Sequence, residues 1–141
     1  MTSATTAPAH LPTIINPSHL HDPRPNGYST AVAAPASGRM VFVSGQGGQE
    51  RDGSLSPDFA AQMKQAYANL AAVLEALGAE VAQVMKLTVY VVDHDMSKLG
   101  VLTSGVTRMF GATLPAQTLV PVPKLAVDGM LFEVEAIVSV Q

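Results

Sequence analysis

The chain has 141 residues, of which 48% are apolar and only 13% charged, and its formal net charge is −3. This length fits one domain with its own core, and the lack of cysteine excludes disulfides, thiolate nucleophiles and sulfur-bound zinc. The basic residues are scattered singly, which argues against nucleic acid as a partner. No apolar run is long enough to span a membrane. The low charge favours burial of part of the surface against another subunit.

The chain begins with small, polar and proline-bearing residues, and we predict a flexible arm over residues 1–13 ahead of a single domain over 14–141. The arm lacks the basic start and long apolar core of a signal peptide, so we expect a cytoplasmic protein. Prolines and an Asn-Gly turn predict a loop over 15–27. A first strand is predicted over 28–33, and a stronger strand over 39–46 ends in a group of glycines.

Two helices are predicted in the middle of the chain. Ser56 is the expected N-cap of the first, Pro57 its first residue and Asp58 an acid in its first turn. Its end is expected at Gly78. Apolar residues recur at helical spacing and mark its buried face: Phe59, Met63, Ala66, Leu70, Val73, Leu74 and Leu77. A weaker helix is predicted over 97–110.

Strands are also predicted over 83–93 and 129–140, and their two faces differ. One face of each is apolar, with Met85, Leu87, Val89 and Val91 in the first and Phe132, Val134, Ala136, Val138 and Val140 in the second. We therefore predict an α+β fold in which two helices pack on the apolar face of one sheet. The opposite face mixes carboxylates with large apolar groups, and the low overall charge favours its contact with another subunit.

The segment LPAQTLVPVPKL (114–125) reads as an extended strand interrupted by Pro115, Pro121 and Pro123. Because proline cannot donate to the hydrogen-bond ladder, this segment is expected at an edge or a bulge. A lone amide, Gln117, lies near its beginning.

Three groups of polar residues are candidates for chemistry. Glu133 and Glu135 share one strand face about 7 Å apart, and they either orient water and take a proton or form a structural ion pair, for example with Lys86. The glycines after Ser44 either present bare backbone N–H groups to a small ligand or form an ordinary turn. The histidines are spread over loops without a carboxylate-rich cluster, which gives no metal site.

Six segments together resemble the reactive intermediate deaminase (Rid) family, also called the YjgF family. They are NGYSTAV (26–32), MVFVSGQGG (40–48), DFAAQMKQAYANLAAVLEALGA (58–79), VMKLTVYVVD (84–93), LPAQTLVPVPKL (114–125) and FEVEAIV (132–138). The resemblance implies a chorismate-mutase-like α+β fold with a mixed sheet, and a homotrimer with three clefts between subunits. Members with deaminase activity hydrolyse 2-imino acids or their enamine tautomers to 2-oxo acids and ammonia, without a metal or an organic cofactor.

The resemblance also assigns roles to residues of this chain. Glu133 matches the catalytic glutamate that positions the attacking water. The matching substrate-binding positions are Tyr28, Ser44, Gly45 and Leu119, the last at a position that often holds cysteine. Gln117 stands where active members carry an arginine that clamps the substrate carboxylate.

Arginine supplies a fixed charge and a two-pronged donor, whereas Gln117 supplies one uncharged amide. We therefore predict a small-metabolite-binding protein that resembles the 2-iminobutanoate/2-iminopropanoate deaminases as a hydrolase of enamines or imines. Its substrate is expected to differ from a simple 2-imino acid. The alternatives are a trimer that binds a metabolite without turnover and an endoribonuclease or translation inhibitor, which the acidic balance of the chain disfavours.

Overall fold

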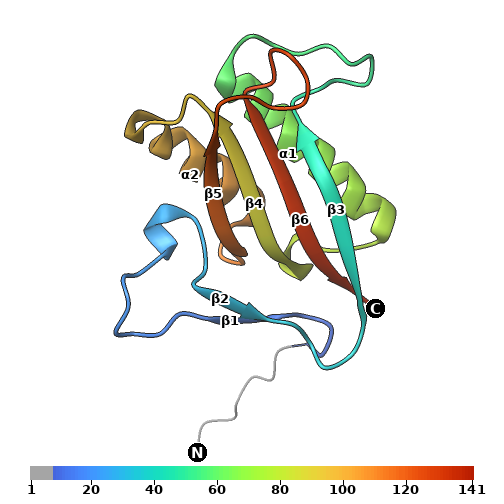
Figure 1. Cartoon of the computed structure of the whole chain (residues 1–141). Helices are drawn as coiled ribbons and strands as arrows, with labels where there is room; N and C mark the ends of the chain where they lie inside the picture. Colours follow the sequence, from blue (N-terminus) through green and yellow to red (C-terminus); the bar gives the residue numbers. More distant parts are fainter. Residues whose placement is uncertain (1–7) are drawn as a thin grey trace, which may run out of the picture.

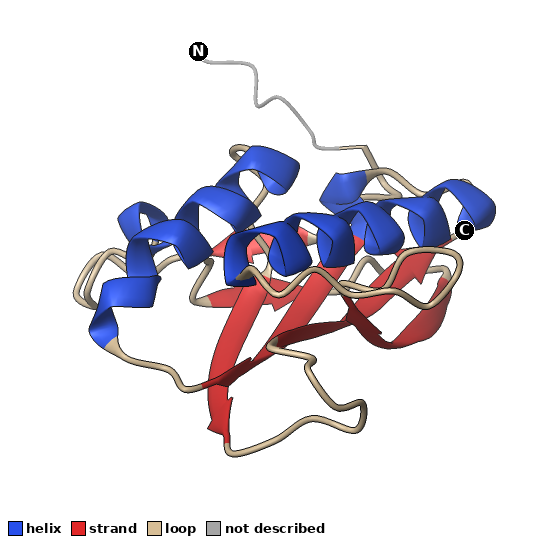
Figure 2. Ribbon diagram, turned by 90° about the horizontal axis from the view of Figure 1, so that it is seen from above, coloured by secondary structure: helices blue, strands red, loops and turns tan. Residues whose placement is uncertain are grey.

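The computed structural model describes residues 8–141 and consists mainly of a four-stranded sheet with two helices on one face (Figure 1). Across the sheet the strands are β3 (Arg39–Gly47), β6 (Phe132–Val140), β4 (Val84–Val92) and β5 (Ala116–Val122). The β4–β5 pair is parallel and the other two pairs are antiparallel. Both helices, α1 (Phe59–Leu77) and α2 (Leu99–Phe110), lie on the same side of the sheet (Figure 2). The predicted α+β fold is confirmed.

The core lies between the sheet and the helices, where the alternation of the strands predicted it. The inward residues of β4 and β6 are all buried, and Phe132 is fully so. Its ring lies against that of Tyr67 from α1, with 5.6 Å between the ring centroids. From Lys86 onward in β4, and along β6 apart from Ser139, the outward residues are only half-buried, so one side of the sheet is free of helices.

The helix α1 begins two residues later than expected. Asp58 is its N-cap, and its carboxylate accepts a hydrogen bond from the N–H of Ala61 at 2.9 Å. The assignment of Ser56 as the cap was wrong, because its hydroxyl instead accepts a hydrogen bond from the N–H of Asp58 at 3.1 Å. Gly78 ends the helix as predicted, in a left-handed conformation with φ of 66°.

The N-terminal part of the domain differs from the prediction. A three-residue strand, β1 (Thr13–Ile15), pairs with β2 (Ala31–Ala33) in a separate two-stranded sheet. The strand expected over 28–33 is therefore extended and paired only in its second half, while Ser29 makes an isolated bridge to Ala116. A strand as short as β1 shows no alternation that the sequence could reveal.

Short 3-10 helices complete the connections: η1 (Arg24–Asn26), η2 (Val81–Gln83) and η3 (Met96–Lys98), which leads into α2. The first seven residues of the predicted arm lie outside the described part. Of its remainder, His10 places Nε2 3.1 Å from a carboxylate oxygen of Glu80. Within residues 8–141, no helix is both long and apolar enough to cross a membrane.

Candidate functional site

Three of the candidate residues line one cavity of about 290 Å³ at the β5 edge of the sheet. They are Tyr28, Gln117 and Leu119, and the wall is completed by Asn26, Leu99, Leu102 and Thr103. The β4–β5 register places Gln117 beside Leu87 and Leu119 beside Val89. Because Leu87 and Val89 belong to the core, the two β5 side chains face the helix layer. The cavity therefore lies between β5, the first turns of α2 and the chain around Tyr28.

The amide of Gln117 is the most unusual group in this cavity. Its carbonyl oxygen, Oε1, is buried and has no hydrogen-bond partner among residues 8–141. An unpaired buried acceptor costs about 1–3 kcal/mol, and such groups are rare in folded proteins. A ligand that donates a hydrogen bond inside the cavity would remove this cost.

A second group forms where β3 departs from regular pairing. The β3–β6 register shifts between Val43 and Gln46, so Ser44 and Gly45 lie in a β-bulge. A Cβ atom on Gly45 would lie 1.7 Å from Oε1 of Glu133, whose registered partner on β3 is Gly47. With the carboxylate of Glu133 in this position, only glycine fits beside it. Bulges are frequent next to active sites because they redirect the backbone and its donors.

The two glutamates of β6 have different surroundings. The hydroxyl of Tyr90 donates a hydrogen bond to Glu135, and this bond is the main cause that raises the pKa of Tyr90. Glu133 has no hydrogen-bond or ion-pair partner among residues 8–141. The alternative of an ion pair with Lys86 is not found, because Lys86 Nζ donates to the hydroxyl of Thr118 at 2.8 Å. Glu133 is therefore the carboxylate left free for chemistry.

The structure does not unite the six candidate residues within one chain. Strands β3 and β5 are opposite edges of the sheet, separated by β6 and β4, which corresponds to about 14 Å. Gln117 faces the helix layer, whereas Glu133 is the cross-strand neighbour of Tyr90 on the other face. One chain thus carries two half-sites: a cavity group (Tyr28, Gln117 and Leu119) and a bulge group (Ser44, Gly45 and Glu133).

Sequence reasoning missed several residues of these half-sites. Asn26 was assigned only to a turn, and Thr103 was one polar residue of a weak helix, yet both line the cavity. No sequence pattern around either residue indicates a place in the cavity, because that place depends on how α2 packs beside β5. Within residues 8–141, no cluster of three or more histidines and carboxylates could hold a metal ion.

Known proteins resemble this chain over most of its length. The family model described as Endoribonuclease L-PSP matches residues 21–140. A RutC family protein of Pyrococcus abyssi is 36% identical over 119 residues, which cover 82% of this chain and 88% of that protein. The 2-iminobutanoate/2-iminopropanoate deaminase of Escherichia coli K12 is 34% identical over 102 residues, which cover 71% of this chain and 79% of the enzyme.

Solved structures give the same result. A Rid family protein of unknown function from Yersinia pestis, YyfB, superposes with a TM-score of 0.87 at 33% identity, over 92% of this chain and 98% of that one. The YjgF gene product of E. coli superposes with a TM-score of 0.65 at 28% identity, over 99% of this chain and all of that one. The chain therefore belongs to the Endoribonuclease L-PSP family, which is the YjgF/Rid family that its sequence resembles.

Proposed function

We propose that this protein is a hydrolase of a small imine or enamine, that its active sites lie between the subunits of a homotrimer, and that its substrate is not a simple 2-imino acid. The observation that carries the proposal is the buried, unpaired amide oxygen of Gln117 in the wall of a cavity beside Tyr28. Relatives that are named imine deaminases support the reaction class.

A site between subunits explains why the two half-sites of one chain are apart. The helix-free face of the sheet carries exposed apolar side chains on β3, with Met40 55% and Phe42 71% exposed. A second copy of the chain that covers this face would bury them. In such an assembly the bulge group of one chain meets the cavity group of its neighbour, and the six residues form one cleft.

The bulge group supplies the hydrolytic step. Glu133 holds a water against the imine carbon, takes one proton as the oxygen attacks and returns it to the nitrogen, which gives a neutral carbinolamine. Glu133 then takes the remaining proton from the carbinolamine hydroxyl and delivers it to the nitrogen as the carbon–nitrogen bond breaks, so that ammonia leaves and a carbonyl product forms. The backbone at Gly45, which no side chain shields, donates its N–H to the ligand.

The cavity group selects the substrate. A glutamine amide offers one acceptor and one NH₂ donor without charge, which matches a neutral carboxamide or a similar donor–acceptor pair. A carboxylate would be held without the charged fork of an arginine, and hydrogen bonds to charged groups contribute about 1.5–3 kcal/mol. The loss corresponds to about 10- to 100-fold weaker binding of a carboxylate substrate.

The test compares two substrates that differ only in the group that Gln117 would contact, a carboxylate or a carboxamide. 2-Iminobutanoate and 2-iminobutanamide are prepared from the corresponding oxo compounds in concentrated ammonia, and release of the carbonyl product is followed after dilution. We expect the protein to accelerate hydrolysis of the amide more than that of the acid. Equal acceleration of both substrates contradicts the role of Gln117, and acceleration of neither contradicts imine hydrolysis.

A pair of variants separates catalysis from general damage to the site. Glu133→Gln is expected to lower the rate about 100-fold or more, because it removes the carboxylate that takes the proton from the water. Glu135→Gln is the matched control, since it changes the neighbouring carboxylate, which already accepts a hydrogen bond from Tyr90. If both variants lose activity equally, Glu133 has no special role.

The alternatives give different results in the same assays. A trimer that only binds a metabolite would take up the amide without any gain in rate. The family model's description names an endoribonuclease activity. If this protein has that activity, cleavage of single-stranded RNA should persist after repeated purification and disappear in Glu133→Gln. The net charge of −3 disfavours RNA as a substrate.

A further inference from the structure

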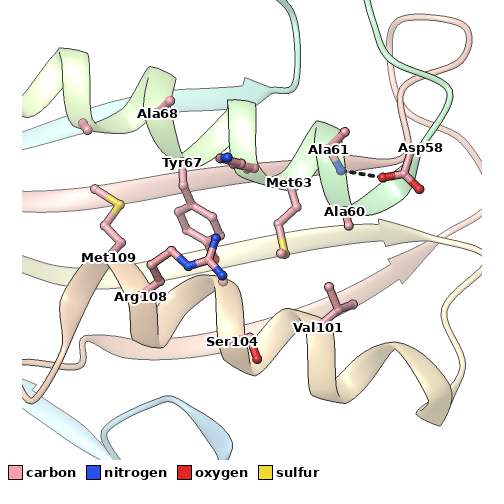
Figure 3. Close-up of a pocket in the computed structure, with 13 residues that line it drawn as sticks. Asp58, Ala60, Ala61, Met63, Tyr67, Ala68, Val101, Ser104, Arg108 and Met109 are labelled. Atoms are coloured by element: carbon pink, nitrogen blue, oxygen red, sulfur yellow. Dashed lines mark hydrogen bonds between the residues drawn. The ribbon is translucent and has the colours of Figure 1, made fainter.

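A groove of about 440 Å³ runs between α1 and α2 (Figure 3), and its lining shares no residue with either half-site. Met63 and Tyr67 of α1 and Val101 and Met109 of α2 supply its larger apolar side chains. Four alanines of α1 complete this wall: Ala60, Ala61, Ala68 and Ala71. The alanines span twelve residues, or about 16 Å of helix. The groove therefore has the length and the lining to hold an extended apolar chain.

The open space follows from small residues at positions where helices usually carry long polar ones. All four alanines are exposed, so no core packing requires them to be small. On α2, a Cβ atom on Gly105 would lie 2.5 Å from the methyl carbon of Met63. Glycine therefore lets α2 approach α1 closely at the floor, while the alanines keep the groove open above it.

Tyr67 places an unpaired hydroxyl in the groove. The residue as a whole is only 6% exposed and lines the groove. Its hydroxyl oxygen is accessible from the groove and has no hydrogen-bond partner within residues 8–141. Burial of the side chain raises the pKa of Tyr67 well above its usual value, so the hydroxyl stays protonated and has a proton to donate to a ligand.

The charges around the groove favour an anion. Arg108 of α2 points toward Tyr67 (Figure 3), and Lys64 of α1 also lines the groove. Neither forms an ion pair with any residue of the described part. Asp58 is the one carboxylate in the lining, and it already accepts the N–H of Ala61. Two unpaired cations thus flank an apolar groove in a protein of net negative charge.

We propose that this groove binds an amphipathic carboxylate, namely a medium-chain fatty acid. The carboxylate lies between the guanidinium of Arg108 and the hydroxyl of Tyr67, and the hydrocarbon chain lies over Met63 and the alanines of α1. The volume falls within the range of about 300–1,000 Å³ that is typical of small-molecule sites. The helix layer lies on the opposite side of the sheet from the face assigned to the trimer contact, so this site does not depend on the proposed function.

The proposal is tested by calorimetry on the full chain with decanoate and two analogues, decanol and decyltrimethylammonium. We expect decanoate to bind at one site per chain, decanol at least 10-fold more weakly, and the cationic analogue not at all. Arg108→Met should weaken decanoate binding about 10- to 100-fold and leave decanol binding unchanged. Binding of decanol as tight as that of decanoate, or an unaltered affinity in Arg108→Met, overturns the proposal.

Two further variants control for loss of charge and for loss of space. Arg51→Met removes an exposed arginine in a loop outside the groove, and decanoate affinity should not change. Ala68→Leu fills the groove and should weaken decanoate and decanol alike. Amide shifts in a ¹⁵N NMR titration with decanoate should cluster on α1 and α2. Shifts that cluster around Tyr28 and β5 instead place the fatty acid in the other cavity and contradict the proposal.

Discussion

The carboxylate of Glu133 occupies the space that a side chain at position 45 would need. The 1.7 Å between a Cβ on Gly45 and Oε1 of Glu133 is too short for both to remain in place. The obstructing atoms are the far end of a flexible side chain, which can swing away while the backbone stays. At Gly48, by contrast, a Cβ atom would meet the backbone of Gln62 at 2.5 Å, and a helix cannot move as cheaply.

Two alanine substitutions should therefore separate function from stability. Gly45→Ala should displace Glu133 and abolish imine hydrolysis, while the free energy of unfolding changes by less than about 1 kcal/mol. Gly48→Ala should lower the free energy of unfolding by about 2 kcal/mol or more, because α1 must shift away from β3. Urea unfolding and the hydrolysis assay measure both quantities. An active Gly45→Ala variant would show that the position of Glu133 does not matter.

For individual residues, the sequence predicted the candidates for the site but not the groups that contact them. Strand alternation placed Glu133 and Glu135 on one face, and the structure agrees. The register pairs Tyr90 with Glu133, but the hydroxyl of Tyr90 reaches diagonally to Glu135. Which glutamate is free therefore depends on the register and on this side-chain direction, and no local sequence pattern encodes either. The division of the six residues into two half-sites also depends on strand order, which is a property of the whole sheet.

A buried amide of α1, that of Gln62, connects the helix to two other segments of the domain. Gln62 is fully buried, and its Nε2 donates to the carbonyl oxygens of Ser56 at 2.7 Å and Gly129 at 2.9 Å. Its Oε1 accepts a hydrogen bond from the N–H of Leu131 at 2.8 Å. One side chain thus joins the segment before α1 to the loop that leads into β6.

Gln62→Met should destabilise the domain by about 3 kcal/mol, because three partly buried hydrogen bonds to the backbone are lost while the volume is nearly kept. Gln65→Met is the matched control on the same helix. The Gln65 side chain is half-buried and bonds only to Asn69 within α1, so a change below about 1 kcal/mol is expected. Urea unfolding monitored by circular dichroism gives both values. Equal losses in the two variants would contradict the connecting role of Gln62.

Helices and strands with a regular spacing of apolar residues could be predicted from the sequence. Elements that form only through contact with distant segments could not. The prolines of β5 correctly indicated an edge strand, since Pro121 stands in the strand that ends the sheet. The role of Gln62 could not be predicted, because a single polar residue among the apolar residues of a helix does not reveal that loops will surround it. The short β1 likewise exists only through its pairing with β2.

The whole molecule presents a sheet face that a single chain leaves uncovered. Phe42 is 71% exposed on β3, so we expect it in the contact between subunits. Light scattering should give three times the chain mass of 14.7 kDa. Phe42→Glu should dissociate the trimer, because it places a charge in an apolar contact. Phe42→Leu keeps the contact apolar and should remain trimeric, and a wild-type monomer would contradict the assignment of this face.

We propose that this protein hydrolyses imines through Glu133 and that Gln117 excludes simple 2-imino acids. Both parts are tested by the rate of 2-oxobutanoate release from 2-iminobutanoate, measured for the wild-type protein and for Gln117→Arg. We predict that the variant is about 10- to 100-fold faster than the wild type at low substrate concentration, because arginine restores a charged clamp for the carboxylate. A variant that remains trimeric and is no faster than the wild type would contradict the claim.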